Sequence, residues 1–309
     1  MPWGGRDAVK VVITGAAGFI GQALVRRVRA EGWETILVTR PEHSGPWSKD
    51  EVVPAALEDY KTLGKRIGGC DCLVHLAWAG TRGKLRADRD LQRKNTLYSS
   101  QGVESMLQAG CRRIIIAGSQ AEYGLQQGQV TEETECKPDT AYGKAKFQFF
   151  QEASELCAQY GASCIELRVF SLFGPGDAED TLISSTLRNM RKNAPCRFTQ
   201  GTQRWDYLYI SDAAEAFFRS CTESCPNGCY NIASGISRPL REYIEQMADI
   251  TETNSPLLFG AFSSASPPPG LWADISRARR RMGWAPKVSF EAGIRAILRA
   301  WDQEKPDMA

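Results

Sequence analysis

Short apolar runs alternate with stretches of helical periodicity through the first half of the chain. The runs are typical of strands buried on both faces and lie at residues 9–14, 35–39, 72–77 and 113–117, and a further strand is predicted at 163–170. Apolar residues recurring at helical spacing predict helices at residues 19–31, 60–67, 88–108 and 140–160. Strands joined by helices imply crossover connections and a parallel sheet. We therefore expect an α/β fold with a doubly wound parallel sheet of Rossmann type.

The second half of the chain has a less regular pattern. It predicts a short strand and several helices, at residues 207–210, 180–192, 212–220, 275–282 and 289–301. Stretches rich in Ser and Pro at 41–48 and 263–270 are expected to be loops. We predict a dinucleotide-binding Rossmann domain over 1–170 and a smaller mixed α/β substrate lobe over 171–309. Residues from about 205 to 222 are expected to return to the Rossmann part.

Composition and charge exclude several classes of function. The chain of 309 residues is 42% hydrophobic and 24% charged, as is typical of a globular protein with its own core. Its net charge of +2 gives no support for a nucleic-acid partner, and we interpret the basic cluster at 277–281 as a solvated helix face. Residues 1–7 lack the apolar run of a signal peptide, and no stretch approaches the roughly 18 apolar residues of a membrane span. We expect a cytoplasmic protein with no membrane partner.

The cysteines and histidines narrow the candidate chemistry. The ten cysteines are scattered and several lie in apolar strands, as expected in a reducing compartment. Cys221, Cys225 and Cys229 do not match the spacing of a zinc site, so we predict no metal centre. Of the two histidines, His75 lies inside an apolar run and is expected to be a core residue rather than a member of a catalytic triad.

A glycine-rich turn, TGAAGFIG at residues 14–21, joins the first predicted strand to the first predicted helix. Gly15 would permit the tight turn, Gly18 would let the backbone approach a pyrophosphate, and Gly21 would let the helix pack closely. The helix N-terminus offers free N–H groups and the positive end of its dipole to phosphates. The turn therefore predicts a dinucleotide site, with a merely tight strand–helix connection as the alternative.

The end of the second predicted strand bears on the choice of cofactor. In dinucleotide folds an acidic residue here holds the ribose 2′-hydroxyl of NAD, whereas an Arg can accommodate the 2′-phosphate of NADP. No Asp or Glu stands at this strand end, but Arg40 does, and its guanidinium matches phosphate geometry. We therefore favour NADP(H) over NAD(H). In the alternative, Arg40 is a surface residue and the ribose is held by the backbone.

Tyr142 and Lys146 stand four residues apart in the first turns of a predicted helix, so they share one face. A neighbouring ammonium and a cofactor cation would lower the pKa of the tyrosine from about 10, which suits general acid–base work. Ser119 ends the isoleucine-rich strand, at the sheet edge where ligands bind. The three residues predict a catalytic site. A surface coincidence of the Tyr/Lys pair is the alternative.

Together these segments resemble the extended short-chain dehydrogenase/reductase family, which contains nucleotide-sugar epimerases, dehydratases and ketoreductases. The resemblance covers nearly the whole chain and rests on TGAAGFIG at 14–21, HLA at 75–77, GSQAEYG at 118–124, YGKAK at 142–146, LRVFSLFGPG at 167–176, WDYLYISD at 205–212, and the closing segments at 273–276 and 283–284. It implies an enzyme that binds a nicotinamide dinucleotide and a nucleotide-diphosphate sugar. It also implies a homodimer that pairs through the two long helices.

The resemblance assigns roles to individual residues. Tyr142 would be the acid/base, Ser119 would bind the same sugar oxygen, and Lys146 would bind the nicotinamide ribose. The remaining implied cofactor contacts are Phe19, Ile20, Leu76, Ala77 and Asn95, beside the three glycines of the turn. The implied substrate contacts are Ser119, Tyr142 and Ser171, with Arg204 as a substitute for cations that the family keeps elsewhere.

Departures from the family pattern guide the choice of activity. The sequence has Gln120 and Ala121 where the dehydratases carry their acid and base, which argues against water elimination. Trp205 stands where the epimerases keep an Arg, and Ala56 where the family keeps an adenine-binding Asp. We expect an NADP(H)-dependent reductase of a nucleotide-linked 4-keto-6-deoxy-sugar. The alternatives are an NAD-dependent nucleotide-sugar 4-epimerase and a non-catalytic dinucleotide-binding regulator.

Overall fold

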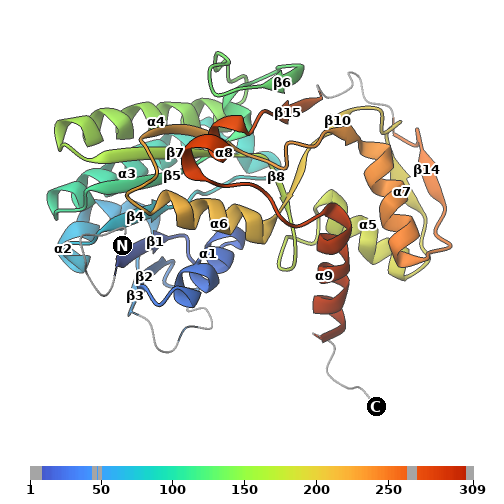
Figure 1. The fold of residues 1–309 in the computed structure, drawn as a ribbon, viewed down its shortest axis with the longest axis horizontal. Helices are drawn as coiled ribbons and strands as arrows, with labels where there is room; N and C mark the ends of the chain where they lie inside the picture. Colours follow the sequence, from blue (N-terminus) through green and yellow to red (C-terminus); the bar gives the residue numbers. More distant parts are fainter. Residues whose placement is uncertain (1–8, 44–46, 48–50, 263–269, 304–309) are drawn as a thin grey trace.

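A seven-stranded, entirely parallel sheet forms the larger part of the protein (Figure 1). The computed structural model describes residues 9–43, 47, 51–262 and 270–303. In spatial order the strands are β12 (Gly228–Ile232), β7 (Ser163–Val169), β5 (Arg113–Ser119), β4 (Cys72–His75), β1 (Lys10–Thr14), β2 (Glu34–Thr39) and β3 (Glu51–Pro54). This arrangement confirms the expected doubly wound Rossmann fold.

Alternate residues of the strands belong to two hydrophobic cores, which lie on opposite faces of the sheet. Val11 and Ile13 belong to one core, which also takes the apolar stripes of α1 (Phe19–Ala30) and α6 (Ile210–Ser220). Val12 belongs to the other core. That face is covered by α2 (Leu63–Ile67), α3 (Arg89–Gln108) and α4 (Ala141–Gln159). Because successive side chains of a strand point to opposite faces, a continuous apolar run is what a sheet covered on both sides requires.

A third hydrophobic core lies apart from the sheet, on the right of Figure 1. It is built by α5 (Leu182–Arg191), α7 (Leu240–Thr251), α9 (Phe290–Gln303) and the strand pair β9 (Cys196–Phe198) and β14 (Leu257–Phe259). The other short elements are η1 (Leu57–Thr62), η2 (Gly83–Ala87), η3 (Gln120–Glu122), β6 (Gly128–Val130), β8 (Ser171–Phe173), β10 (Arg204–Trp205), β11 (Tyr207–Tyr209), β13 (Arg238–Pro239), β15 (Leu271–Ala273) and α8 (Ser276–Met282).

The chain crosses between the sheet and the third core more than once. Helix α6 packs beside α1 in the first core, and β12 then pairs with β7 at the edge of the main sheet. The domain division at residue 170, with a return at about 205–222, stays a prediction. We did not predict β3, β12 or α7 from the sequence.

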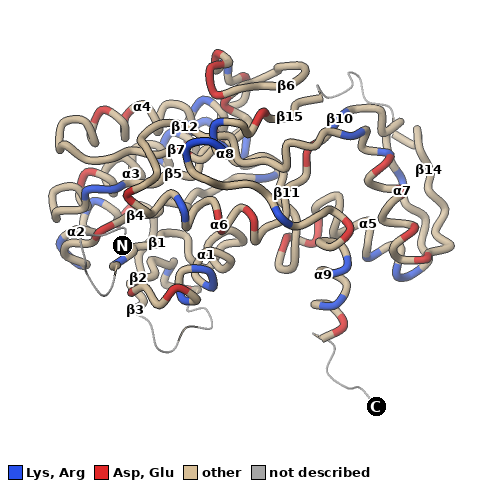
Figure 2. The backbone as a smooth tube through the Cα atoms, viewed as in Figure 1, with Lys and Arg blue, Asp and Glu red and all other residues tan. Residues whose placement is uncertain are grey.

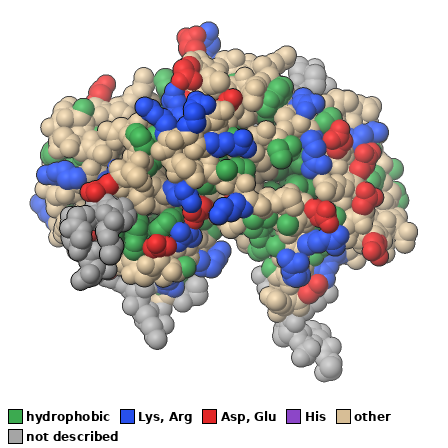
Figure 3. All heavy atoms as spheres, viewed as in Figure 1, with side chains coloured by type: hydrophobic (Ala, Val, Ile, Leu, Met, Phe, Trp, Pro, Cys, Tyr) green, Lys and Arg blue, Asp and Glu red, His purple; other side chains and the backbone are tan. Residues whose placement is uncertain are grey.

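Charged residues of both signs are scattered along the backbone (Figure 2). Helix α8 carries the basic cluster noted in the sequence, and Arg279, Arg280 and Arg281 are exposed there (Figure 3). This confirms a solvated helix face. Across the described ranges, no helix combines the length and apolarity needed to cross a bilayer.

Candidate active site

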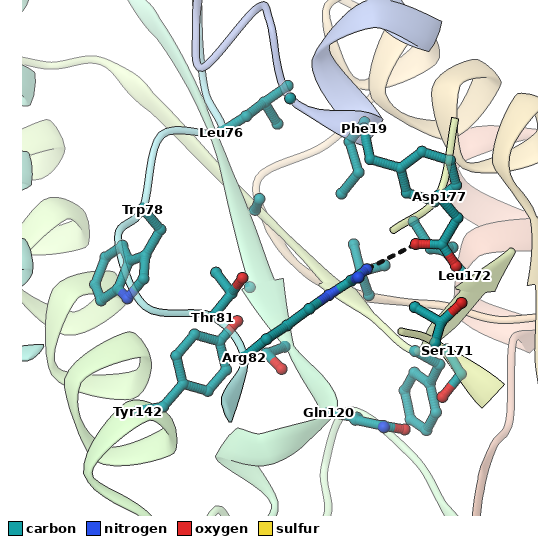
Figure 4. A pocket seen from close by; sticks show the side chains of 18 of the residues that line it. Phe19, Leu76, Trp78, Thr81, Arg82, Gln120, Tyr142, Ser171, Leu172 and Asp177 are labelled. Atoms are coloured by element: carbon teal, nitrogen blue, oxygen red, sulfur yellow. Dashed lines mark hydrogen bonds and ion pairs between the residues drawn. The ribbon is translucent and has the colours of Figure 1, made fainter. Parts of the chain in front are cut away.

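A cavity of about 580 Å³ opens where the carboxyl ends of β1, β4, β5 and β7 meet segments of the third core (Figure 4). Its volume falls within the usual range of ligand sites. It brings together most of the residues predicted from the sequence: Gly15, Gly18, Phe19, Ile20, Gly21, Leu76, Ser119, Tyr142, Lys146 and Ser171. The switch point of a doubly wound sheet is where such folds bind ligands.

The glycine turn has the geometry of a phosphate cradle. Gly15 adopts φ +68°, and a Cβ there would lie 2.8 Å from the backbone nitrogen of Ala77. A Cβ on Gly21 would lie 2.3 Å from the carbonyl oxygen of Gly15. Helix α1 starts after Gly18 with no side-chain cap and no acidic residue in its first turn. The uncapped N-terminus faces the cavity, so these residues fit the diphosphate of a dinucleotide.

Tyr142 and Lys146 lie on one face of α4, next to the end of β5. The Lys146 ammonium group donates a hydrogen bond to the carbonyl oxygen of Ala117 (3.0 Å) and lies 3.8 Å from the ring centroid of Trp78. The Ser119 side chain, whose Oγ accepts from the Ala121 N–H (3.2 Å), lies close enough to the Tyr142 hydroxyl to lower its pKa. Thr140 caps the helix by accepting from the Gly143 N–H (3.0 Å), which fixes the first turn that carries Tyr142.

The protein groups alone raise the pKa of Tyr142, which differs from the sequence expectation. Burial raises the pKa of Tyr142, and the nearby Ser119 hydroxyl and the charge of Arg86 lower it by less than burial raises it. Burial also lowers the pKa of Lys146 to about 7, against the opposing charges of Glu122 and Glu166. Lys146 lies 6.0 Å from the Tyr142 ring centroid and is not among the groups that shift the pKa of Tyr142. The expectation rested on the charges of Lys146 and of a cofactor cation; with the protein groups alone, burial keeps Tyr142 a protonated phenol.

A buried charged cluster supports the strand end that carries Ser119. Glu122 accepts a hydrogen bond from the Ser119 backbone N–H (2.6 Å), and the Nε of Arg168 lies 3.1 Å from Glu122 Oε2 and 2.9 Å from Glu166 Oε2. All three charged side chains are at most 5% exposed. Burial and the proximity of the two carboxyls raise the pKa of Glu122, and burial raises that of Glu166. The cluster holds Ser119 in place and puts negative charge near Lys146.

Four predicted site residues do not line the cavity. Asn95 is buried and clamps Ala79, because its Nδ2 donates to the Ala79 carbonyl (2.8 Å) and its Oδ1 accepts from the Ala79 N–H (3.2 Å). Ala77 supports the turn by donating to Thr14 Oγ1 (3.3 Å). The Arg204 guanidinium donates hydrogen bonds to the side chain and the carbonyl oxygen of Ser237. Arg40 is exposed after β2, with its Nη1 3.2 Å from Glu42. Asn95 and Ala77 therefore shape the loop after β4, and their predicted contacts with the cofactor stay predictions.

Several cavity residues were not assigned to the site from the sequence. Those that the cavity adds include Trp78, Thr81, Arg82, Arg86, Asp177, Trp205 and Tyr207. Trp78 could have been assigned to the site from the sequence, since it directly follows the apolar run that ends at the sheet edge. Arg82 and Asp177 lie on loops far apart in sequence, where periodicity carries no information. Only the tertiary fold brings them together.

The remaining sequence expectations concern His75 and the cysteines. His75 is buried between Thr14 Oγ1 (3.0 Å) and Ser99 Oγ (2.9 Å), and burial lowers its pKa to about 3. The expected core histidine is confirmed. All ten cysteines are free thiols. No group of three potential metal-binding side chains occurs in the part of the chain that the structure describes.

Comparison with known proteins gives one family match and many distant relatives. The model of the NAD dependent epimerase/dehydratase family matches residues 11–233. An uncharacterized UDP-glucose epimerase of Bacillus subtilis is 24% identical, with 93% of this chain and 96% of the relative covered. The dTDP-4-dehydro-6-deoxyglucose reductase of Escherichia coli is 25% identical, with 94% and 96% covered. The solved structure of MoeE5 in complex with UDP-glucose and NAD superposes with a TM-score of 0.84 at 24% identity, over 95% of this chain and 99% of that one.

Proposed function

Because the chain belongs to the NAD dependent epimerase/dehydratase family, we propose that it is an NADP(H)-dependent reductase of a nucleotide-linked 4-keto-6-deoxy-sugar. The family match agrees with the motif resemblance and with an NAD(P)-dependent enzyme. The observation that carries the finer proposal is the buried Tyr142 hydroxyl, which lines the cavity together with Ser119 and is a protonated phenol at neutral pH. A phenol that keeps its proton is suited to donating that proton to a carbonyl oxygen, which is what reduction requires.

The side chains have distinct tasks in this reaction. Hydride transfer from the nicotinamide to sugar C4 is the chemistry that a bound cofactor supplies. Tyr142 donates its proton to the sugar O4 as the carbonyl becomes an alcohol, and Ser119 donates a hydrogen bond to the same oxygen. Lys146 is fixed by Ala117 and Trp78, where it can hold the nicotinamide ribose. Gly18, Phe19 and Ile20 hold the cofactor diphosphate at the start of α1.

Support for NADP(H) comes from the end of β2. Val38 accepts a hydrogen bond from the Gly15 N–H (3.1 Å), so the strand that leads into Arg40 adjoins the glycine turn. Among the described residues, the exposed guanidinium of Arg40 contacts Glu42 (3.2 Å) and His43 (3.2 Å), both at the surface. A 2′-phosphate can replace these contacts at little cost, because exposed ion pairs contribute little.

The Arg40→Gln variant tests this preference. We expect its KM for NADPH to rise by about tenfold or more, because a charge-assisted contact to a phosphate is lost. The KM for NADH should stay within about twofold, which makes NADH the internal control. Steady-state kinetics with both cofactors give the answer. Equal changes in the KM values for NADH and NADPH would show that Arg40 does not bind the 2′-phosphate.

A substrate panel tests the proposed activity. The purified protein is mixed with NADPH or NADH and with 4-keto-6-deoxy-sugars linked to CDP, dTDP, UDP or GDP. We expect loss of the NADPH absorbance with at least one of them. Tightly bound dinucleotide, with interconversion of UDP-sugars and no net cofactor turnover, would instead indicate a 4-epimerase.

Two further properties complete the proposal. The long helices α3 and α4 lie side by side, and Leu97 of α3 is 49% exposed, so we place a homodimer contact on this face. Light scattering should give twice the chain mass of 34.2 kDa, and a monomer at micromolar concentration would contradict it.

The ten free thiols are typical of a reducing compartment, which supports a cytoplasmic location.

A further inference from the structure

An ion pair crosses the candidate active site from one wall to the other (Figure 4). Arg82 follows β4, on the wall formed by the main sheet, and Asp177 follows β8, on the wall formed by the third core. Their Nη2 and Oδ1 atoms are 2.7 Å apart. The Asp177 side chain is 3% exposed and also accepts from the Ala178 N–H (2.8 Å), whereas the Arg82 side chain is 47% exposed. The carboxylate is therefore fixed in its wall, and the guanidinium reaches to it across the cavity.

Positive charge in the cavity is confined to one wall. Among the described lining residues, the cations are Arg82, Arg86 and Lys146. Lys146 is held by the Ala117 carbonyl, and Arg86 stacks on the Tyr142 ring at 4.3 Å. The opposite wall, from Ser171 to Tyr207, contributes Asp177 but no described cation. Arg82 is thus the cation whose charged group already lies at that opposite wall.

A reductase of nucleotide sugars must hold two diphosphates, one from each ligand. The uncapped start of α1 serves the cofactor diphosphate. The other diphosphate must lie towards the third core when the sugar is at Tyr142. On that wall α5 begins at Leu182, capped by Thr181, and the described lining residues there include no cation. We propose that Arg82 binds the diphosphate of the nucleotide sugar and that Asp177 holds its guanidinium until that diphosphate displaces the carboxylate. This inference rests on the proposed function and names the group that recognises its substrate class.

The chemistry and local backbone suit such an exchange. A guanidinium forms paired hydrogen bonds with phosphate as readily as with carboxylate. The second carboxylate near Arg82 is Asp180, 3.8 Å away and 82% exposed, so solvent weakens its hold. Gly83 follows Arg82 with φ +59°, and no atom lies within 4 Å of the place its Cβ would take. A glycine directly after Arg82 gives the backbone more conformational freedom at this point than any other residue would.

Opposite effects of the two partner residues on nucleotide affinity test the proposal. The Kd of the nucleoside diphosphate that binds best among CDP, dTDP, UDP and GDP is measured by calorimetry. We expect Arg82→Gln to raise this Kd by about ten- to a hundredfold. Asp177→Asn should lower it severalfold, because the competing carboxylate is gone. Lys84→Gln and Glu179→Gln, two exposed charges in the same segments that do not pair with Arg82, are matched controls and should change the Kd less than twofold.

Binding of NADPH, followed by its fluorescence, distinguishes the two sources of diphosphate. The proposal predicts that Arg82→Gln leaves the NADPH Kd unchanged. A loss of NADPH affinity with unchanged nucleotide affinity would assign Arg82 to the cofactor and overturn the proposal. Weaker nucleotide binding in Asp177→Asn would also overturn the proposal, because the ion pair would then hold the two walls of the site together instead of competing with the ligand. A wild-type protein that binds no nucleoside diphosphate would contradict the proposed function itself, whereas intact binding in Arg82→Gln would contradict this inference alone.

Discussion

Replacing Tyr142 with phenylalanine is expected to lower kcat by about a hundred- to ten-thousandfold, the usual contribution of a positioned general acid. The change removes the one hydroxyl that would give its proton to the sugar oxygen. It keeps the ring, which stacks under Arg86 and packs edge-on against Trp78 at 6.4 Å. The fold and the cofactor affinity should therefore survive. Single-turnover kinetics with NADPH measure the loss in the chemical step.

Tyr230→Phe is the matched control for this variant. Tyr230 is a fully buried tyrosine in β12, away from the cavity, and its hydroxyl donates to the Pro226 carbonyl (2.8 Å). Its loss should lower stability by about 1 kcal/mol and leave kcat unchanged. If Tyr142→Phe also kept kcat within a few fold, the proton would have to come from another group, and the assignment of Tyr142 would be wrong.

The largest expected loss of stability follows from replacing Arg168 with methionine. The variant leaves Glu122 and Glu166 buried without their cation, and breaking a buried ion pair in this way costs about 3–5 kcal/mol. The loss should grow with pH. A carboxyl whose pKa is raised in the folded state stabilises the fold while it is protonated, and this stabilisation is lost as the pH rises through that pKa. Both carboxyls already have raised pKa values, and removal of Arg168 raises them further.

Denaturant unfolding between pH 5 and 8 measures this effect. Arg295→Met serves as the control, because its pair with Glu291 is half exposed and should be worth less than about 0.5 kcal/mol at any pH. Arg168→Lys keeps a charge and should recover part of the loss. A loss in Arg168→Met that is small, or that shrinks towards high pH, would mean that the carboxyls are not held by this guanidinium.

The sheet was predictable because its strands are buried on both faces. The runs at β1, β4 and β5 are mostly apolar, which favoured buried strands, whereas β7 carries the buried Glu166 and Arg168 between apolar residues. Strand β12 was not predicted, because its sequence GCYNI includes Asn231, a buried polar residue that accepts from the Tyr123 hydroxyl (2.7 Å). Helix α7 could have been predicted from its sequence. Its buried residues Leu240, Tyr243, Ile244 and Met247 follow helical spacing.

The candidate site was predictable where its residues lie on regular elements. The glycine turn, Ser119 at a strand end, and the pair Tyr142 and Lys146 on one helix face all line the cavity. Two features depend on the tertiary structure and could not come from spacing. One is the desolvation that raises the pKa of Tyr142 and lowers that of Lys146. The other is the meeting of Arg82 with Asp177, whose loops belong to different walls.

Transfer of a labelled hydride tests the central claim most directly. The protein is incubated with a 4-keto-6-deoxy-sugar nucleotide and NADPH that carries deuterium at nicotinamide C4, and the product is analysed by mass spectrometry and NMR. We expect one deuterium at sugar C4 in the wild type and at most a trace in Tyr142→Phe. A reduced sugar without deuterium, or a labelled product formed equally well by Tyr142→Phe, would contradict the account.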